Sequence, residues 1–533
     1  MPLTAKRPLF IWGIFIGIFL LMNYCTPSQE SSEVGVSPNI ILIMADDMGY
    51  SDLGCYGSEI KTPNLDRLAQ EGMRMTQFYN TAKCTETRAT LLTGLHFQQT
   101  DNLNRSDNNV TLAEVLKESS YQTIMAGKWH LGNWAEEVDT PNKRGFNQYF
   151  GFLNGASNFF TGRNYSDDIN YMRLNDEVFE APDDFYTTDA FTDFAVDQIS
   201  AAQEQEQPFF LYLAHNAPHY PLQAPEENIA KYQGVYDIGW DSLRQQRLDR
   251  MKDLGIIKPE WELTPRDSLT PAWTDLSEAQ QQEEADLMEV YAGMIDRLDE
   301  QIGRILNHLD ELNITENTLV VFLSDNGGCP FDANHFPILP PGPQESARTY
   351  DTEWAQASNT PFRKYKQWIH EGGISTPMII RWPERIQPNS LSKEAGQLVD
   401  IMPTFLEAAD INYPSQYENR QLLPLEGVSL LPAWEGSQLS RTVPMFWEFR
   451  GSRAVRDGNW KLVAQRGDTW ELYNIADDRI EMNSLVDEQA ERVKLMITAY
   501  DDWAARVGAH SNEASMSMPL NQQDRYLYED ETE

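Results

Sequence analysis

Acidic residues follow two separate apolar runs of the chain, and side chains of this type hold metal ions. Asp46 and Asp47 come directly after "NIILIMA", and Asp325 and Asn326 come directly after "TLVVFLS". Neighbouring carboxylates repel each other unless a cation neutralises them. Their oxygen atoms suit a hard cation, Ca²⁺ or Mg²⁺. Two such pairs, each behind an apolar strand, favour a metal site over the alternative that each pair merely caps a turn.

Lysine and histidine residues gather near further turns and would add positive charge to such a site. They are Lys128 and His130 in "GKWHLG", His215 and His219 in "HNAPHYP", and Lys364, Lys366 and His370 in "KYKQWIHEGG". Beside a carboxylate-bound metal, such cations and imidazoles form a pocket for a tetrahedral oxyanion. The alternative for each residue alone is a solvated lysine, or a histidine in an ordinary polar contact.

These residues lie between strands and helices that alternate from residue 39 onward. Predicted strands cover 39–44, 121–127, 208–214, 318–328 (with its turn) and 376–382, and predicted helices cover 62–72, 112–120, 284–312 and 400–410. The continuous apolar run at 39–44 is typical of a strand buried on both faces. The alternation predicts an α/β fold with a large mixed, mostly parallel sheet sandwiched by helices. In open sheets of this type, ligands bind beyond the carboxyl ends of the strands.

The pattern changes after about residue 415. "SRAVRDGNWKLVAQ" reads as two strands around a turn, "TWELYNI" as another short strand, and 487–506 as a helix. These elements predict a smaller C-terminal α+β domain with a short antiparallel sheet. The stretch 230–283 is polar and looks irregular, so we interpret it as an insertion that shapes a binding cleft.

The N-terminus has the pattern of an export signal. Lys6 and Arg7 precede an apolar run that is too short to span a membrane comfortably. Cys25 closes this run and resembles the lipidated cysteine of bacterial lipoproteins, and the alternative is a plain cleaved signal peptide. We therefore expect an exported protein, either periplasmic, anchored to the outer membrane by its lipid, or secreted.

The predicted organisation follows from these segments. It comprises a signal peptide (1–25), a linker (26–37), a catalytic α/β domain (38–414), a C-terminal α+β subdomain (415–510) and an acidic tail (511–533). The net charge of −39 excludes nucleic acid as a partner, and it leaves a lipid anchor as the expected route to a membrane.

Three cysteines remain after Cys25, and an odd number in an exported protein indicates that one has a chemical role. They are Cys55, Cys84 and Cys329. Cys55 and Cys329 both follow the acidic turns, where they either form a disulfide or remain free thiols.

Eight segments in order resemble the motifs of the type I sulfatases, the arylsulfatase-like branch of the alkaline phosphatase superfamily. They are "ADDMGYSDLGCYG", "TPNLDRLA", "CTETRATLLTG", "GKWHLG", "APHYPLQAP", "SDNGG", "KQWIHEGGISTPMIIRWP" and "AVRDGNWKLV", and they span residues 38 to 475. The resemblance implies that a maturation enzyme oxidises Cys84 to Cα-formylglycine (3-oxoalanine). One hydroxyl of the hydrated aldehyde then attacks sulfur, and the other expels sulfate. The family usually has proline or alanine where this chain has Glu86, within the segment that the maturation enzyme reads.

The resemblance also implies roles for the residues above. Asp46, Asp47, Asp325 and Asn326 match the ligands of one Ca²⁺ ion, to which residue 84 adds an oxygen; Mg²⁺ is the less favoured ion. Arg88 and Lys128 would hold the diol, His130 would take its proton, Lys366 would contact sulfate, and His219 would protonate the leaving oxygen. Lys364 and His370 would line the substrate side, and we interpret His215 as structural.

The expected function is hydrolysis of sulfate esters, on a sulfated polysaccharide or its oligosaccharides. One alternative is a phosphodiester or phosphonate monoester hydrolase of the same superfamily, and another is a sulfatase for small aryl sulfates. If Cys84 is never oxidised, the chain would instead be a non-catalytic binder of sulfated glycans.

Overall fold

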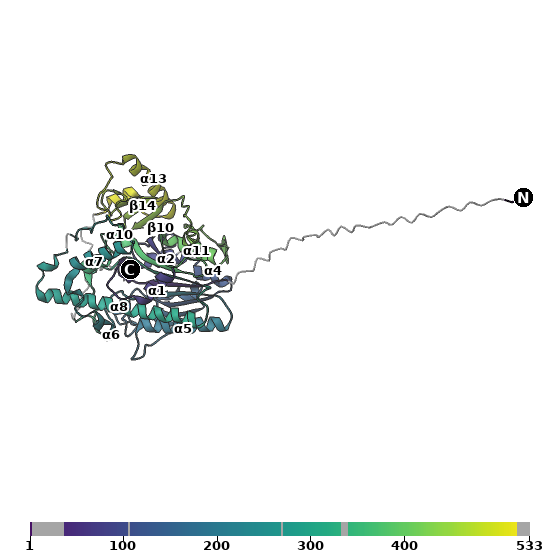
Figure 1. Ribbon diagram of the computed structural model, residues 1–533, viewed down its shortest axis with the longest axis horizontal. Helices are drawn as coiled ribbons and strands as arrows, with labels where there is room; N and C mark the ends of the chain where they lie inside the picture. The colour runs from purple at the N-terminus through teal and green to yellow at the C-terminus, as the bar shows by residue number, and fades with distance from the viewer. Residues whose placement is uncertain (3–36, 105–106, 268–269, 332–338, 520–533) are drawn as a thin grey trace. The chain divides into compact units, whose positions relative to one another are not determined.

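The computed structural model describes residues 1–2, 37–104, 107–267, 270–331 and 339–519 (Figure 1). The predicted signal peptide, Cys25, nearly all of the linker and the end of the acidic tail lie outside these residues. Among the described residues, no helix combines the length and apolar character that crossing a membrane requires. The described residues from 37 to 519 form one compact unit, and the boundary at 414/415 inside it stays a prediction.

A ten-stranded sheet forms the centre of this unit, in the order β10-β2-β9-β8-β1-β7-β3-β4-β5-β6. Its strands are β1 (Asn39–Ala45), β2 (Met73–Tyr79), β3 (Gln122–Gly127), β4 (Gln148–Phe152), β5 (Met172–Leu174), β6 (Glu177–Val178), β7 (Phe209–Ala214), β8 (Thr318–Ser324), β9 (Ser375–Arg381) and β10 (Ser390–Gln397). β1 pairs in parallel with β7 and β8, β3 with β4 and β7, and β10 with β2, whereas β9 runs antiparallel to β2 and β8. β5 pairs antiparallel with β4 and β6. The predicted mixed, mostly parallel sheet is confirmed.

β1 is buried on both faces, as its apolar run predicts. Ile41 and Ile43 pack into one hydrophobic core, and Leu42 and Met44 pack into the other. Successive side chains of a strand point to opposite faces of the sheet, so a strand between two cores must be apolar at every position.

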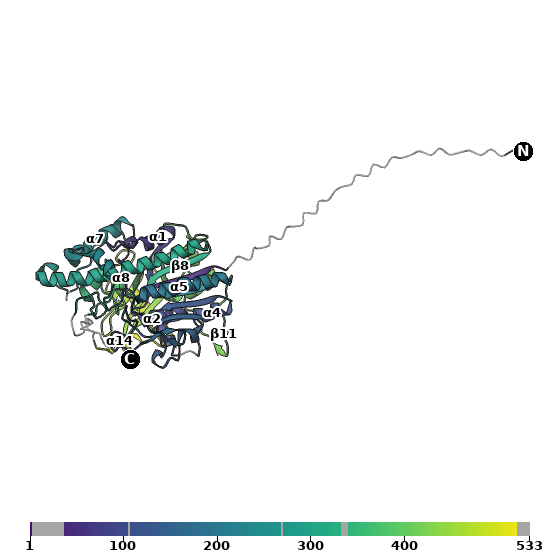
Figure 2. The same ribbon diagram turned by 90° about the horizontal axis from the view of Figure 1, so that it is seen from below.

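Helices cover both faces of the sheet (Figures 1 and 2). On one face lie α1 (Pro63–Glu71), α5 (Thr187–Glu204), α6 (Glu226–Ile229), α7 (Gly239–Asp253), α8 (Glu278–Glu311) and α9 (Asp351–Ser358), and α5 runs beside α8. The other face carries α2 (Cys84–Thr93), α4 (Leu112–Glu118), α11 (Ile401–Ala408) and α12 (Leu431–Trp434). Two further single-turn helices are α3 (Phe97–Thr100) and α10 (Glu371–Ile374).

The helix α8 begins six residues earlier than the predicted 284–312. Ser277 accepts a hydrogen bond from the backbone N–H of Gln280, and the Gln280 side chain accepts one from the backbone N–H of Ser277. This reciprocal capping box fixes the start of the helix ahead of its apolar positions, so a search for apolar periodicity alone places the start too late.

The prediction of an irregular segment at 230–283 is wrong. α7 lies within it, and Tyr236, Trp240 and Trp273 are buried there, with the rings of the two tryptophans 4.7 Å apart. The segment looks irregular in the sequence because α7 buries charged side chains. Arg247 is fully buried in ion pairs, so the helix lacks the apolar stripe by which a packed helix is usually found.

The C-terminal part contains the predicted antiparallel sheet. It consists of β13 (Met445–Phe449), β14 (Ser452–Asp457), β15 (Trp460–Ala464) and β16 (Glu471–Asn474), in that order, after a two-stranded ribbon of β11 (Gln416–Tyr417) and β12 (Arg420–Gln421). α13 (Ala490–Val507) packs on one face of the four-stranded sheet, and the short α14 (Asn512–Ser517) follows it. The other face packs against Tyr79 and Ala82, which lie in the segment that leads into α2.

Candidate active site

Strand register brings the acidic pairs to one edge of the sheet. The last residue of β1, Ala45, lies opposite Ser324, the last residue of β8. Asp46 and Asp325 therefore leave neighbouring strands at the same level. On the other side of β1, Met44 lies opposite Ala214, which in turn lies opposite Gly127 of β3. The segments that carry Lys128, His130 and His219 therefore start at this same edge, as the sequence predicts.

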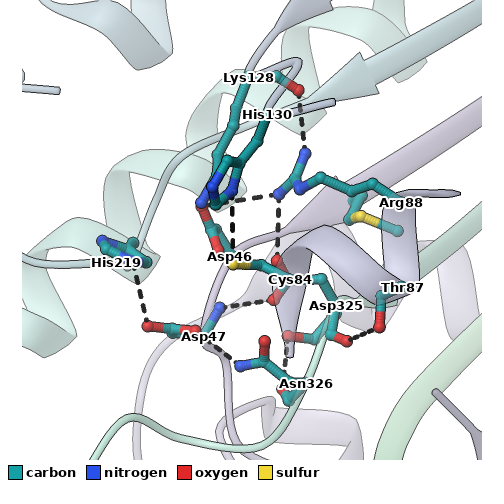
Figure 3. Close-up of polar contacts among 12 residues, drawn as sticks. Asp46, Asp47, Cys84, Thr87, Arg88, Lys128, His130, His219, Asp325 and Asn326 are labelled. Carbon is teal, nitrogen blue, oxygen red and sulfur yellow. Dashed lines mark hydrogen bonds and ion pairs between the residues drawn. The ribbon is translucent and has the colours of Figure 1, made fainter. Parts of the chain in front are cut away.

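Cys84 is the first residue of α2, and its side chain points into this cluster (Figure 3). Its sulfur and one carboxylate oxygen each of Asp46 and Asp325 lie within 4.8 Å of one another. Asp46, Asp47 and His219 form a second such group. All five residues are buried.

Two contacts fix the start of α2 against the end of β8. The Thr87 hydroxyl donates to the backbone carbonyl of Asp325 at 2.7 Å. Arg88 Nη2 lies 3.1 Å from the Asp325 carboxylate, and Arg88 Nη1 donates to the Lys128 carbonyl at 3.0 Å. Burial opposes the charge of Arg88, but Tyr212, Asp46 and Asp325 raise its pKa, so the guanidinium stays protonated. Arg88 thus joins the ends of β1, β3 and β8.

Two buried lysines neutralise the aspartates of the first pair. Lys128 Nζ lies 2.7 Å from Asp46 Oδ2, and Lys366 Nζ lies 2.8 Å from Asp47 Oδ1. Burial would raise the pKa of Asp46, but Lys128, His219 and Arg88 outweigh it and lower that pKa well below its usual range. Burial and the neighbouring Asp46 instead raise the pKa of Asp325 well above its usual range. The cations of the protein therefore neutralise the negative charge of Asp325 less completely than that of Asp46.

The oxygen atoms of this cluster fit a hard cation. Asp46 Oδ1 and Asn326 Oδ1 are buried and have no hydrogen-bond partner among the described residues. The Asn326 amide nitrogen donates to Asp47 Oδ1 at 2.6 Å and to the Gly327 carbonyl, which leaves Oδ1 as its free acceptor. Buried oxygens without a donor are costly unless a cation binds them. The structure thus brings Asp46, Asp47, Cys84, Asp325 and Asn326 together in an arrangement that suits a metal.

The two histidines of the cluster differ in their contacts. His130 Nδ1 lies 3.5 Å from the sulfur of Cys84, and its Nε2 lies 3.3 Å from the Thr85 hydroxyl. Burial, followed by Lys128 and Arg88, lowers the pKa of His130 well below 6.5, so the ring is neutral and can accept a proton. His219 Nδ1 lies 2.6 Å from the Tyr220 carbonyl and must carry a hydrogen there, while Nε2 lies 3.5 Å from Asp47 Oδ2.

Three other predicted residues contact different parts of the protein. Lys364 pairs with Asp267 at 3.0 Å and lies over the ring of Trp368, and His370 pairs with Glu471 of β16 at 3.2 Å. Within the described residues, neither side chain contacts the acidic cluster. His215 is fully buried at the end of β7, and both its ring nitrogens lack a partner there. This position agrees with a structural interpretation of His215.

Cys55 and Cys329 are buried free thiols, so the disulfide alternative for this pair is wrong. Cys329 instead lies near the Asp46–Asp47 turn, where burial and the neighbouring Asp47 raise the pKa of its thiol well above the usual value. Burial likewise raises the pKa of the Cys55 thiol. Both thiols are therefore protonated and weakly reactive.

A buried network that the sequence did not reveal holds the Asp46–Asp47 turn in place. Asp52 Oδ2 accepts hydrogen bonds from the Gly49 N–H and from the Tyr291 hydroxyl, both at 2.8 Å. Asp52 Oδ1 lies 2.6 Å from Arg247 Nη1, and the Tyr291 hydroxyl also lies 3.3 Å from the Asp47 carbonyl. Asp52 lies in the quoted motif "DDMGYSDLG", so the sequence offered a clue to its role. Arg247 lies in the segment that looked irregular, so the sequence offered no such clue for it.

Comparison with known proteins identifies the family to which this chain belongs. The family model described as Sulfatase matches residues 38–411, and a model described as N-sulphoglucosamine sulphohydrolase, C-terminal, matches residues 362–499. The chain belongs to the sulfatase family. It is a sulfuric ester hydrolase.

The sulfatase matches its relatives over most of its length. It is 35% identical to an uncharacterised sulfatase of Schizosaccharomyces pombe, over 88% of this chain and 94% of that protein. It is 36% identical to an arylsulfatase of Klebsiella aerogenes, over 74% of this chain and 91% of that protein. The crystal structure of Ps i-CgsB in complex with k-i-k-neocarrahexaose superimposes with a TM-score of 0.65 and 25% identity, over 92% of this chain and 96% of that one.

The network around Asp52 predicts that Arg247 controls metal affinity from outside the metal site. In Arg247→Gln, Asp52 loses its buried ion pair and the turn that carries Asp47 loosens. We expect the dissociation constant for a divalent metal ion to rise about tenfold, equivalent to about 1.4 kcal/mol. Calorimetric titration of the metal-free protein with Ca²⁺ measures this constant.

Arg244→Gln is the matched control. Arg244 lies on the same helix, is equally buried, and donates to the carbonyl and hydroxyl of Thr264 rather than to the metal-bearing turn. Its loss should lower stability without weakening metal binding. Equal metal affinities in the two variants would show that Arg247 serves only the packing of α7.

Proposed function

We propose that this sulfatase removes sulfate from a sulfated polysaccharide or its oligosaccharides outside the cytoplasm, through a formylglycine formed from Cys84 and a bound Ca²⁺ ion. The observation that carries the proposal is the position of Cys84, whose side chain ends among the carboxylates of Asp46 and Asp325 and beside His130. No other described cysteine lies in such a group of potential metal ligands.

An unmodified cysteine suits this position poorly. Burial, with a smaller contribution from Asp325, raises the pKa of the Cys84 thiol despite Lys128 and Lys366 nearby. A thiol with a raised pKa is a weak nucleophile, because the thiolate is the reactive form. The carboxylate and amide ligands around it suit a cation that prefers oxygen to sulfur. Conversion of Cys84 to formylglycine, whose hydrate presents hydroxyl oxygens where the sulfur lies, removes both conflicts.

Asp46, Asp47, Asp325, Asn326 and the oxygen at residue 84 would hold the Ca²⁺ ion. When bound, the ion supplies positive charge that polarises the sulfate group and the attacking oxygen. Calcium would fit better than Mg²⁺, because several carboxylates and an amide converge, whereas Mg²⁺ usually keeps several waters and binds only one or two carboxylates.

The remaining side chains bind sulfate and move protons. Arg88, Lys128 and Lys366 are the buried cations around the cluster and would offset the charge of the sulfate. Hydrolysis of R–O–SO₃⁻ by one water gives R–OH and hydrogen sulfate, so each turnover needs a proton at the ester oxygen and a base at the hydrated residue 84. Neutral His130 lies beside residue 84 and would accept the proton there.

His219 would supply the proton to the leaving oxygen. The Tyr220 carbonyl holds Nδ1–H and fixes the ring, so Nε2 faces the cluster. Burial lowers the pKa of His219 below its ordinary value, and the opposing effect of Asp47 and Asp46 is smaller. The two carboxylates would therefore only partly offset the cost of the protonated ring that a general acid requires.

A saccharide substrate and export are supported by different observations. Ps i-CgsB, which shares the fold over nearly the whole chain, binds a hexaose. Lys6, Arg7 and the apolar run before Cys25 have the pattern of a signal peptide, with lipidation of Cys25 as the proposed anchor. Exported enzymes meet large substrates that do not enter the cytoplasm.

The Klebsiella aerogenes relative is named an arylsulfatase, which keeps small aryl sulfates as the second candidate substrate class.

Hydrolysis of a panel of substrates tests the proposed function. The panel combines defined sulfated oligosaccharides, an aryl sulfate, and a phosphate monoester, a phosphodiester and a phosphonate monoester with the same aryl leaving group. We expect kcat/KM to be highest for a sulfated oligosaccharide and higher for the aryl sulfate than for its phosphorus analogues. A higher kcat/KM for the phosphonate would contradict the proposal, and activity restricted to the aryl sulfate would favour the second substrate class.

The proposed general acid makes a separate prediction. His219→Asn should lower kcat for sugar sulfates by about 10²- to 10⁴-fold, because a poor leaving group needs a proton. Nitrophenyl sulfate, with a good leaving group, should lose far less. The measurement is log kcat against leaving-group pKa for a series of sulfates. The slope should become steeper in His219→Asn but not in His130→Asn, and an unchanged slope would remove His219 from this role.

A further inference from the structure

A small cavity lies between α2 and the C-terminal sheet, and the proposed reaction does not use it. Its volume is ≈ 20 Å³, enough for one water molecule or one ion. Polar side chains that line it are Thr81, Glu86, Thr90, Gln98 and Glu448, together with the aromatic rings of Phe446 and Trp447. The cavity is distinct from the site around Cys84, because Glu86 follows two positions later in α2 and so projects about 200° away around the helix.

Glu86 is a buried carboxyl group without a partner. It is only 8% exposed, and it makes no hydrogen bond and no ion pair within the described part of the chain. Two cations, Lys83 and Arg450, act on it electrostatically from a distance and form no ion pair with it. An unpaired buried carboxylate costs several kcal/mol.

Across the cavity, three contacts hold the side chain of Glu448 of β13 in place. Its Oε1 accepts from the Gly451 N–H at 2.7 Å and lies 2.9 Å from His510 Nδ1, and its Oε2 accepts from Gln98 Nε2 at 3.0 Å. A carboxylate has about four lone-pair positions, so Glu448 retains acceptor capacity toward the cavity. His96, on another wall, is 9% exposed and pairs loosely with Glu426 at 3.8 Å.

A third oxygen on the cavity wall is also unsatisfied. The Thr90 hydroxyl lies one helical turn after Glu86, is 3% exposed, and has no hydrogen-bond partner among the described residues. In a helix, the threonine hydroxyl normally donates to a backbone carbonyl of the preceding turn. The buried Thr90 hydroxyl does not, and this observation is independent of the two acidic residues. Two carboxylates and a hydroxyl around a space for one ion form an all-oxygen ligand set.

We propose that this cavity is a second cation site, in which Glu86, Glu448 and Thr90 hold one divalent cation of the hard, oxygen-seeking class. Two carboxylates match the charge of such an ion. The ion joins α2, which carries Cys84, to β13 of the C-terminal sheet.

The test counts bound metal in the full-length protein. After equilibration with Ca²⁺ and gel filtration, the wild type should retain two ions per chain by elemental analysis, and Glu86→Gln should retain one. Because residue 86 lies in the segment that the maturation enzyme reads, bound metal is measured instead of activity. Glu448→Gln, outside that segment, repeats the test and should also retain one ion. Asp457→Asn, an exposed position on the neighbouring strand, is the matched control and should retain two.

Two further measurements separate the second site from the first. Asp325→Ala should lose a different ion, so that Asp325→Ala combined with Glu86→Gln retains none. Tb³⁺ added in place of Ca²⁺ should show luminescence sensitised by Trp447, which lines the cavity, and Glu86→Gln should lose that component. A cooperative thermal transition in each variant shows that it folds.

Equal metal content in the wild type, Glu86→Gln and Glu448→Gln would overturn the proposal, and would mean that Glu86 is buried as a neutral acid. If Asp325→Ala retained as much metal as the wild type, the proposed catalytic ion would be wrong, while a loss confined to the variants of residues 86 and 448 would still support the second site.

Discussion

The structure depends on the burial of three carboxylates at one edge of a parallel sheet. Asp46, Asp47 and Asp325 are all almost fully inaccessible, and each would cost several kcal/mol if it were left unpaired. Arg88, Lys128 and Lys366 neutralise much of this charge. The raised pKa of Asp325 and the unpartnered oxygens of Asp46 and Asn326 are what the proposed metal ion would neutralise. The fixed cations around the cluster would favour the proposed entry of an anionic ester.

The fold brings these carboxylates and cations together through the register of its strands, and contacts from distant segments hold them in place. β1 lies between β7 and β8, so residues more than a hundred positions apart in the chain leave the sheet at one level. Tyr291 of the long helix α8 and Arg247 of α7 both contact Asp52 and so hold the turn that carries Asp47. The segment 230–283 therefore acts as a support for the site, a role that its polar composition concealed.

The positions of the acidic residues in the cluster could be predicted from the sequence because local rules place them. Asp46 and Asp325 each follow a continuous apolar run, and such runs become central strands whose ends meet at one edge. Lys128, His130 and His219 follow strands in the same way. Lys366 could be placed only by resemblance, because it follows α9 and a loop instead of a strand end.

The positions of Lys364 and His370 could not be predicted in this way. Both lie close to Lys366 in the chain. Lys364 nevertheless pairs with Asp267, in the segment 230–283, and His370 pairs with Glu471, in the C-terminal sheet. Sequence proximity to a site residue says little about where a side chain points in an irregular loop. The burial of Arg247 and Glu86 could not be predicted for a related reason. A charged residue is expected to be exposed unless its buried partners or the cavity beside it are known.

The central claim is that residue 84 acts as an oxygen nucleophile made from cysteine. Mass spectrometry of the peptide that contains this residue, from active protein made in its native host, tests the claim most directly. We predict the mass of the aldehyde or its hydrate, and trapping of that aldehyde by a hydrazine reagent with loss of sulfate-ester hydrolysis. A fully active protein whose residue 84 carries only the mass of an unmodified cysteine would contradict the account.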